Sequence, residues 1–287
     1  MKRPAIPLSI LVLLLFMAGD LLAVTASEYA VVINLSGRQR MLTQKMSKEM
    51  LLIANKVDVS GNRENLKKTA ELFDRTLIGL RDGDGAVGLP PTEGRVTLKQ
   101  LAKIEKLWKE FQAVVLQVVQ GGEVDVAKVA ALNLPLLKNM NTAVRLYEKE
   151  AKKVTGKSAG VVINLAGKQR MLTQKMSKEM SLVALNHDAE ENKANLRSTA
   201  SLFDRTLKGL LDGDADLELP GTKDEAIRAQ LGVVDKLWQN FKPLVERASS
   251  IDATAVSQAD LVEMSKLNLP LLKEMNKAVK MYEQLEQ

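Results

Sequence analysis

The feature that most constrains the fold of this chain is an internal duplication. Residues 31–50 read VVINLSGRQRMLTQKMSKEM and residues 161–180 read VVINLAGKQRMLTQKMSKEM, so only two of the twenty positions differ. The spacing between the copies is 130 residues, and it grows to 135 where NLPLLK recurs at residues 133–138 and 268–273. A period this long indicates two duplicated domains rather than a solenoid of short repeats.

Each copy divides into four stretches with helical character. Helices are predicted at about 27–57, 62–80, 93–120 and 123–152 in the first copy, and at about 158–187, 190–210, 222–248 and 256–285 in the second. Segments that contain glycine, proline or serine separate these stretches. Pro135 and Pro270 lie inside the fourth helix of their copies, where each is expected to kink the helix or to delay its start.

Four amphipathic helices joined by short connections predict an up-down-up-down bundle. The predicted fold class is therefore all-α, with two tandem up-down-up-down four-helix bundles after a signal peptide. Trp108 and Trp238 fall in the third helices and are expected to anchor the two cores. The short linker near residues 155–160 can place the bundles side by side with their opening helices parallel, whereas a helical linker would stack them end to end. The sequence leaves both arrangements open.

The composition excludes several classes of protein. The chain has 287 residues, no Cys and a single His, His187. Without Cys there is no disulfide scaffold and no thiolate metal site, and one His argues against a His-based metal centre or a catalytic triad. We therefore expect no metal, no cofactor and no enzymatic activity. The net charge of +6 is spread along the chain, which argues against nucleic acid as a partner.

Residues 1–26 have the pattern of a secretory signal peptide. Lys2 and Arg3 precede an apolar run at residues 8–18, and small residues up to Ala26 suit a cleavage site. The expected location is the periplasm. An uncleaved membrane anchor is the alternative, but Asp20 leaves the run short of the roughly 20 residues that a spanning helix needs.

The opening helix of each copy has two distinct faces. At 100° per residue the first face is apolar and suits the core of its own bundle; it consists of Val31, Leu35, Leu42, Met46 and Ile53. The opposite face mixes large apolar, small and charged residues, namely Ile33, Gly37, Arg40, Met41, Gln44, Lys48 and Leu51. A glycine inside a helix costs about 1 kcal/mol relative to alanine, so its presence suits a close approach of backbones.

This second face can be interpreted in two ways. A guanidinium is planar and offers paired donors that match a planar oxyanion such as nitrate, nitrite or a carboxylate. Two arginines that meet across two helices would repel each other unless an anion lies between them. The residues of this predicted anion site are Gly37, Arg40 and Gln44 in the first copy and Gly167, Arg170 and Gln174 in the second. Alternatively, the arginines are solvated charges on a bundle surface.

The segment INLSGRQRMLTQKM at residues 33–46 resembles the opening helix of the PilJ/NarX-like sensor domain, the periplasmic ligand-binding part of nitrate/nitrite sensor kinases and type IV pilus chemoreceptors. On this resemblance residues 27–153 and 158–287 are two such domains, after the signal peptide at residues 1–26. The family implies that an anion is held at a pair of helices from two subunits by the arginine and by backbone near the glycine. Gly37, Arg40, Gly167 and Arg170 match these positions.

The resemblance also shapes the expected function. We expect an exported, non-catalytic sensor-type protein that binds a small planar oxyanion, nitrate or nitrite first, between the opening helices of its two repeats. Because no second membrane span or signalling domain precedes Gln287, a membrane receptor or sensor kinase is the expected partner. The arginine pair could form within one chain or in a homodimer through the first helices. The alternative function is a structural interaction module that docks a periplasmic receptor domain without a small ligand.

Overall fold

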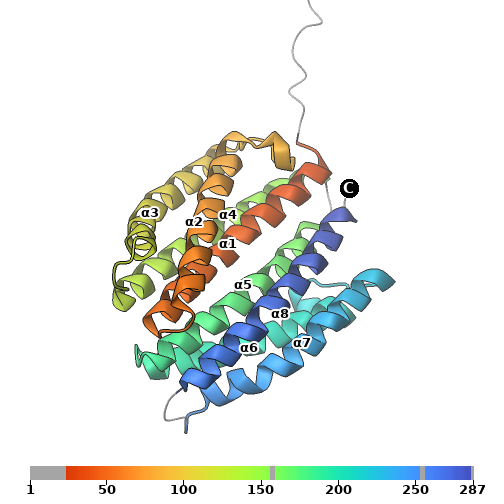
Figure 1. Ribbon diagram of the computed structural model, residues 1–287. Helices are drawn as coiled ribbons and strands as arrows, with labels where there is room; N and C mark the ends of the chain where they lie inside the picture. Colours follow the sequence, from red (N-terminus) through yellow and green to blue (C-terminus); the bar gives the residue numbers. More distant parts are fainter. Residues whose placement is uncertain (1–23, 156–158, 253–255, 286–287) are drawn as a thin grey trace, which may run out of the picture.

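The computed structural model describes residues 24–155, 159–252 and 256–285, and in these residues the chain forms eight α-helices (Figure 1). The first repeat contains α1 (Ala26–Ala54), α2 (Val59–Asp82), α3 (Arg95–Val119) and α4 (Val126–Thr155). The second contains α5 (Ala159–Ala184), α6 (Ala189–Asp212), α7 (Glu225–Ser249) and α8 (Gln258–Gln284). Short 3-10 turns, η2 (Gly85–Val87) and η3 (Ala215–Leu217), follow α2 and α6. The all-α prediction is confirmed.

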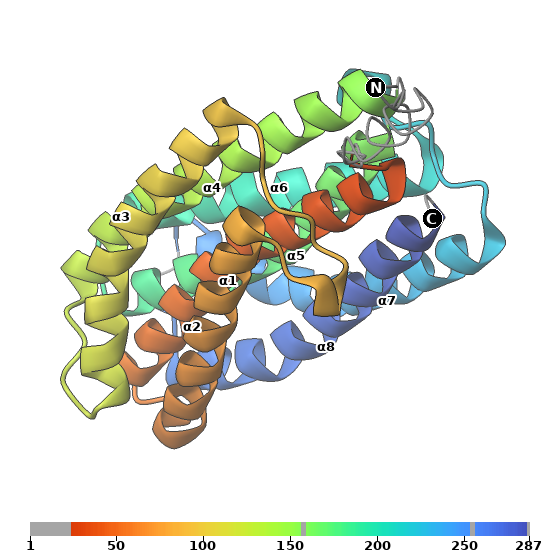
Figure 2. The same cartoon turned by 90° about the horizontal axis from the view of Figure 1, so that it is seen from above.

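The two four-helix bundles lie side by side, with α1 and α5 packed along each other at the centre (Figure 1). In the first bundle α1 also contacts α2 and α4, and in the second α5 contacts α6 and α8. The view from above shows the same pairing, with α2 and α3 on one side of the molecule and α7 and α8 on the other (Figure 2). Of the two arrangements that the sequence left open, the chain adopts the side-by-side one.

The aromatic residues of the third helices anchor the cores, as predicted. The ring centroids of Trp108 and Phe73 are 4.5 Å apart, and the indole nitrogen of Trp108 donates to Asp74 at 2.8 Å. Trp238 repeats the ring contact with Phe203 at 4.7 Å. A buried indole that keeps its hydrogen bond fills the bundle without leaving an unpaired donor. The carboxylate of Asp74 is therefore engaged by the indole of its own bundle.

Local sequence signals set where the helices begin and end. The hydroxyl of Thr25 accepts from the backbone of Glu28 and the Glu28 carboxylate accepts from Thr25, which forms a capping box at the start of α1. Gly83 and Gly213 end α2 and α6 with φ of 88° and 100°. Only glycine adopts that backbone region readily, so these positions stop the helices.

Two predictions need a correction or a restriction. The helix α4 continues through Pro135 and α8 continues through Pro270, so of the two effects expected of these prolines, a kink or a delayed start, the delayed start is wrong. The predicted signal peptide, residues 1–26, lies almost entirely outside the described residues, which begin at residue 24. Among the helices of the described part, none is long and apolar enough to cross a membrane.

Candidate functional site

The opening helix α1 is buried on both of its faces. On the face toward its own bundle, Leu42 and Met46 are at most 2% exposed. On the opposite face, Ile33 and Leu51 are equally buried, because this face packs against α5 of the second bundle. The apolar residues that would be out of place on a solvated surface are thus explained by the contact between the two bundles. The alternative that Arg40 and Arg170 are solvated charges is wrong.

At this contact the two predicted arginines converge. Helices α1 and α5 run parallel and in register, so that Gly37 and Gly167 face the guanidinium groups of both Arg40 and Arg170. A β-carbon on Gly37 would lie 3.3 Å from Nη2 of Arg40 and 3.8 Å from Nη2 of Arg170. A β-carbon on Gly167 would lie 3.1 Å and 3.9 Å from Nη2 of Arg170 and Arg40. The two cationic ends therefore share one small region, and each glycine leaves space there that a side chain would fill.

Neutral oxygens hold Arg40 in place. Nη1 donates to Oδ1 of Asn141 on α4 at 2.9 Å. Nη2 donates to Asn164 on α5, at 2.5 Å to the side-chain Oδ1 and at 3.2 Å to the backbone carbonyl. Since Asn141 belongs to the first bundle and Asn164 to the second, Arg40 joins the two bundles.

Arg170 makes the reciprocal contacts. Its Nη1 donates to Oδ1 of Asn276 on α8 at 3.3 Å, and its Nη2 donates to the backbone carbonyl of Asn34 on α1 at 3.2 Å. The Nε atoms of both arginines are buried and have no hydrogen-bond partner in the described part of the chain. Each guanidinium therefore retains donor capacity that the surrounding residues do not use.

The electrostatics of the pair favour an anion. Arg40 is 1% exposed and Arg170 is 3% exposed. Burial lowers the pKa of Arg40 to about 10 and that of Arg170 to about 9, and repulsion from Arg38 and Arg40 adds to the effect at Arg170. No carboxylate of the described residues is hydrogen-bonded to either guanidinium. The charges of Glu148 and Glu283 act on the arginines from nearby without a hydrogen bond to either guanidinium. An anion between the two groups would further relieve the cost of burial and their mutual repulsion.

A groove of about 570 Å³ lies against Arg170, between α1 and α2 of one bundle and α8 of the other. Asn34, Asn276 and Glu283 line it beside the arginine. All of its remaining charged residues are basic, namely Arg38, Lys45, Lys68 and Lys280. Apart from Glu283 the charges that line this groove are positive, and a mainly positive cleft concentrates anions, so the groove provides an electropositive approach to Arg170.

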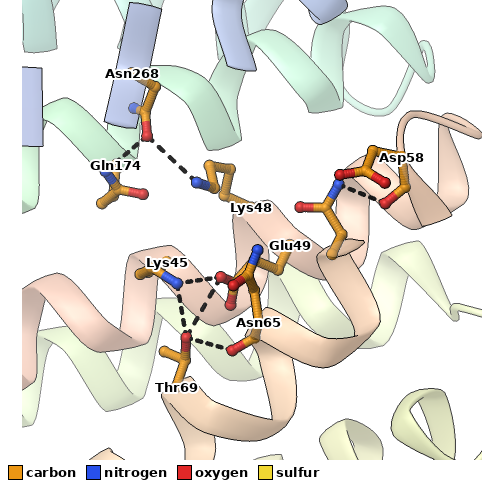
Figure 3. Close-up of polar contacts among 9 residues, drawn as sticks. Lys45, Lys48, Glu49, Asp58, Asn65, Thr69, Gln174 and Asn268 are labelled. Carbon is orange, nitrogen blue, oxygen red and sulfur yellow. Dashed lines mark hydrogen bonds and ion pairs between the residues drawn. The ribbon is translucent and has the colours of Figure 1, made fainter. Parts of the chain in front are cut away.

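The predicted amides Gln44 and Gln174 lie one helical turn beyond the arginines, in a second polar layer. Gln44 donates to Oδ1 of Asn133 and Gln174 donates to Oδ1 of Asn268, each at 2.9 Å. The same Asn268 oxygen accepts from Nζ of Lys48 at 3.3 Å, which crosses from the first bundle to the second (Figure 3). The two glutamines are therefore held by the last helix of their own bundle rather than by the arginines.

The lysine of this layer is an unexpected feature. Lys48 is 4% exposed, and burial lowers its pKa to about 8. Figure 3 shows it pointing toward Asn268, while its neighbour Glu49 points the other way, to Lys45 and Thr69. The pKa of Lys178, the equivalent residue of the second repeat, is also lowered to about 8 by burial, and its Nζ donates to Asn133 at 3.4 Å. Arg40, Arg170, Lys48 and Lys178 are thus buried basic residues at the contact between the bundles.

Sequence reasoning missed the partners of the arginines. These are Asn34, Asn141, Asn164 and Asn276, together with the glutamates that they approach, Glu148 and Glu283. One signal was available: each of these residues occurs in both repeats, at a spacing of 130 in the opening helices and 135 in the fourth helices. Polar residues that recur in both repeats, on helices expected to be buried, could have identified these partners.

Comparison with known proteins agrees with this architecture. The model of the family described as the type IV pili methyl-accepting chemotaxis transducer N-terminal domain, PilJ, matches residues 22–134 and again residues 155–264. The chain is also similar to the methyl-accepting chemotaxis protein McpN of Pseudomonas aeruginosa, with 32% identity over 117 residues. That match covers 41% of this chain and 21% of the relative, so the chain corresponds to only a minor part of that protein.

Proposed function

Since the chain belongs to the family of PilJ-type chemotaxis transducer N-terminal domains, we propose that it is a sensor protein that binds a small planar oxyanion, nitrate or nitrite first, between α1 and α5. The single observation that carries the proposal is the pair of fully buried arginines, one from each repeat, whose hydrogen-bond acceptors are all neutral. A trigonal oxyanion can accept from two guanidinium groups at once and neutralise both.

In this proposal each residue has a defined role. Arg40 and Arg170 make charge-assisted hydrogen bonds to the ion, and Gly37 and Gly167 leave room for it beside the backbone. Gln44 and Gln174 support the site from the next turn through Asn133 and Asn268. The ion is bound and released unchanged, which is the behaviour of a receptor rather than an enzyme.

The position of the site explains how ion binding would be communicated to a partner protein. An ion that bridges the two arginines links α1 to α5, and so favours one relative position of the two bundles over others. A membrane receptor or sensor kinase that contacts both bundles could distinguish these positions. The predicted signal peptide places this exchange in the periplasm. In such a scheme the pair forms within one chain, and the face expected for a homodimer through the first helices is occupied by α5.

The alternative function, a module that docks another helical protein through the same face, has less support. In this chain α5 already covers the Gly, Arg and Gln face of α1, so a partner protein would have to displace a whole bundle to reach it. The buried contact of two helices is a more suitable site for a small ion than for a third helix.

Thermal unfolding tests the proposal. With sodium nitrate at about a hundred times the dissociation constant, the protein should gain about 2.7 kcal/mol over the same concentration of sodium chloride. For a chain of this size the gain corresponds to a rise in melting temperature of roughly 5 to 10 °C. Arg40→Gln and Arg170→Gln should abolish the rise, whereas Arg75→Gln, which removes an exposed arginine of α2, should keep it. Absence of a nitrate-specific rise in the wild-type protein would refute the proposal.

A further inference from the structure

One amide group stands between a cation and an anion at the contact of the bundles. Oδ1 of Asn164 accepts from Nη2 of Arg40 at 2.5 Å, and Nδ2 of the same side chain donates to Oε1 of Glu148 at 2.8 Å. Arg40 and Glu148 both belong to the first bundle, on α1 and α4, whereas Asn164 enters from α5 of the second. The side chain of one bundle is therefore inserted into an arginine–glutamate pair of the other.

The other half of the molecule has a looser version of this arrangement. Nδ2 of Asn34 on α1 donates to Glu283 on α8, and the backbone carbonyl of Asn34 accepts from Arg170 on α5. Its Oδ1 atom is buried and has no partner among the residues that the structure describes. In this half the side-chain amide contacts only the glutamate, and the arginine contacts the backbone, so no single amide bridges the two charges.

The separation of Arg40 from Glu148 matters because their charges already influence each other. The charge of Glu148 raises the pKa of Arg40, which burial lowers, and the charge of Arg40 lowers the pKa of Glu148, which burial raises. The guanidinium of Arg40 and the carboxylate of Glu148 bond to the two ends of one amide, so only that amide separates them. If the amide were absent, a direct Arg–Glu ion pair would satisfy both buried charges. An arginine neutralised in this way would have little remaining attraction for an external anion.

We propose that Asn164 is a positioning residue that keeps Arg40 from pairing with Glu148 and so preserves the charge of Arg40 for the ligand. This inference rests on the proposed function, since it explains why the anion can compete with carboxylates that lie nearby. This role of the Asn164 amide differs from that of a purely structural hydrogen bond, because it disappears when Glu148 is neutral.

Calorimetric titration with sodium nitrate tests the inference in four proteins: the wild type, Asn164→Ala, the double variant Asn164→Ala/Glu148→Gln, and Asn65→Ala as a control at an exposed asparagine of α2. Asn164→Ala should weaken nitrate binding about tenfold or more, since it costs a charge-assisted contact. The double variant should recover most of the affinity, because the arginine then has no carboxylate to pair with. Asn65→Ala should bind as the wild type does.

The outcomes distinguish a failure of the proposed function from a failure of the positioning role. If the wild-type protein binds no nitrate, the proposed function fails. If the wild type binds and Asn164→Ala binds equally well, or if Glu148→Gln does not rescue the loss, the positioning role is refuted. If Asn164→Ala does not fold, Asn164→Ser takes its place, since its side chain is too short to reach both Arg40 and Glu148: it should weaken nitrate binding and regain it with Glu148→Gln, and undiminished binding would overturn the inference.

Discussion

The buried lysine between the bundles gives a prediction about stability and pH. The pKa of Lys48 is lowered from 10.5 to about 8, mainly by burial and further by repulsion from Lys45, while Glu49 acts in the opposite direction. Between pH 8 and pH 10.5 the unfolded chain holds a proton on this lysine that the folded protein has released. Stability therefore rises with pH across this window. The contribution of Lys48 to the rise is roughly 3 kcal/mol over the full window, at 1.36 kcal/mol for each pKa unit.

Urea unfolding of the variant Lys48→Met at pH 7 and at pH 10 measures this contribution. Methionine has a similar length and no charge, so it can occupy the same space between α1 and α8. The increase in the free energy of unfolding from pH 7 to pH 10 should be smaller in Lys48→Met than in the wild type by roughly 2 to 3 kcal/mol. Lys68→Met, at an exposed lysine of α2, is the matched control and should behave as the wild type. An identical pH response of Lys48→Met and the wild type would refute the burial of a charged lysine at this contact.

Three further results are expected. Gly37→Ala should preserve the helix, with a gain in stability of up to about 1 kcal/mol. It should weaken nitrate binding in a titration, because its β-carbon would lie 3.3 Å from Nη2 of Arg40 and 3.8 Å from Nη2 of Arg170. Undiminished binding would show that the ion lies elsewhere. Trp108→Phe should lower the free energy of chemical unfolding by about 1 to 3 kcal/mol, because the Asp74 carboxylate loses its donor and the core loses volume. An unchanged free energy of unfolding would contradict the role of this ring. Nitrate affinity should be constant from pH 6 to 7 and fall progressively above about pH 8, as Lys48, Lys178 and then Arg170 lose their charge. An affinity that rises with pH would exclude a guanidinium site.

The helices and their pairing were largely predictable from the sequence. Apolar periodicity set the limits of α1 to α8 to within three residues, since a bundle helix needs a continuous apolar face. The second face of α1 predicted a contact with another helix, because Ile33 and Leu51 have no reason to be exposed. The duplication then identified α5 as a candidate, since it repeats the same face.

The arrangement around the site was less predictable. The side-by-side packing depends on the path of a short linker, which helical periodicity does not determine. Asn164 and Glu148 lie on helices of different bundles, so their approach to Arg40 is a consequence of tertiary packing alone. The partner of Lys48 is 220 residues away, at Asn268. The sequence placed this lysine on the contact face but offered no sign that it would be buried with an amide as its acceptor.

The stoichiometry of nitrate binding tests the central claim most directly. Isothermal titration of the purified chain, with its molar mass in solution measured in parallel, should give one nitrate per monomeric chain, because Arg40 and Arg170 of the same molecule form the site. Binding should vanish in the double variant Arg40→Gln/Arg170→Gln. One nitrate for every two chains in a dimer, or binding that survives the double substitution, would contradict the account.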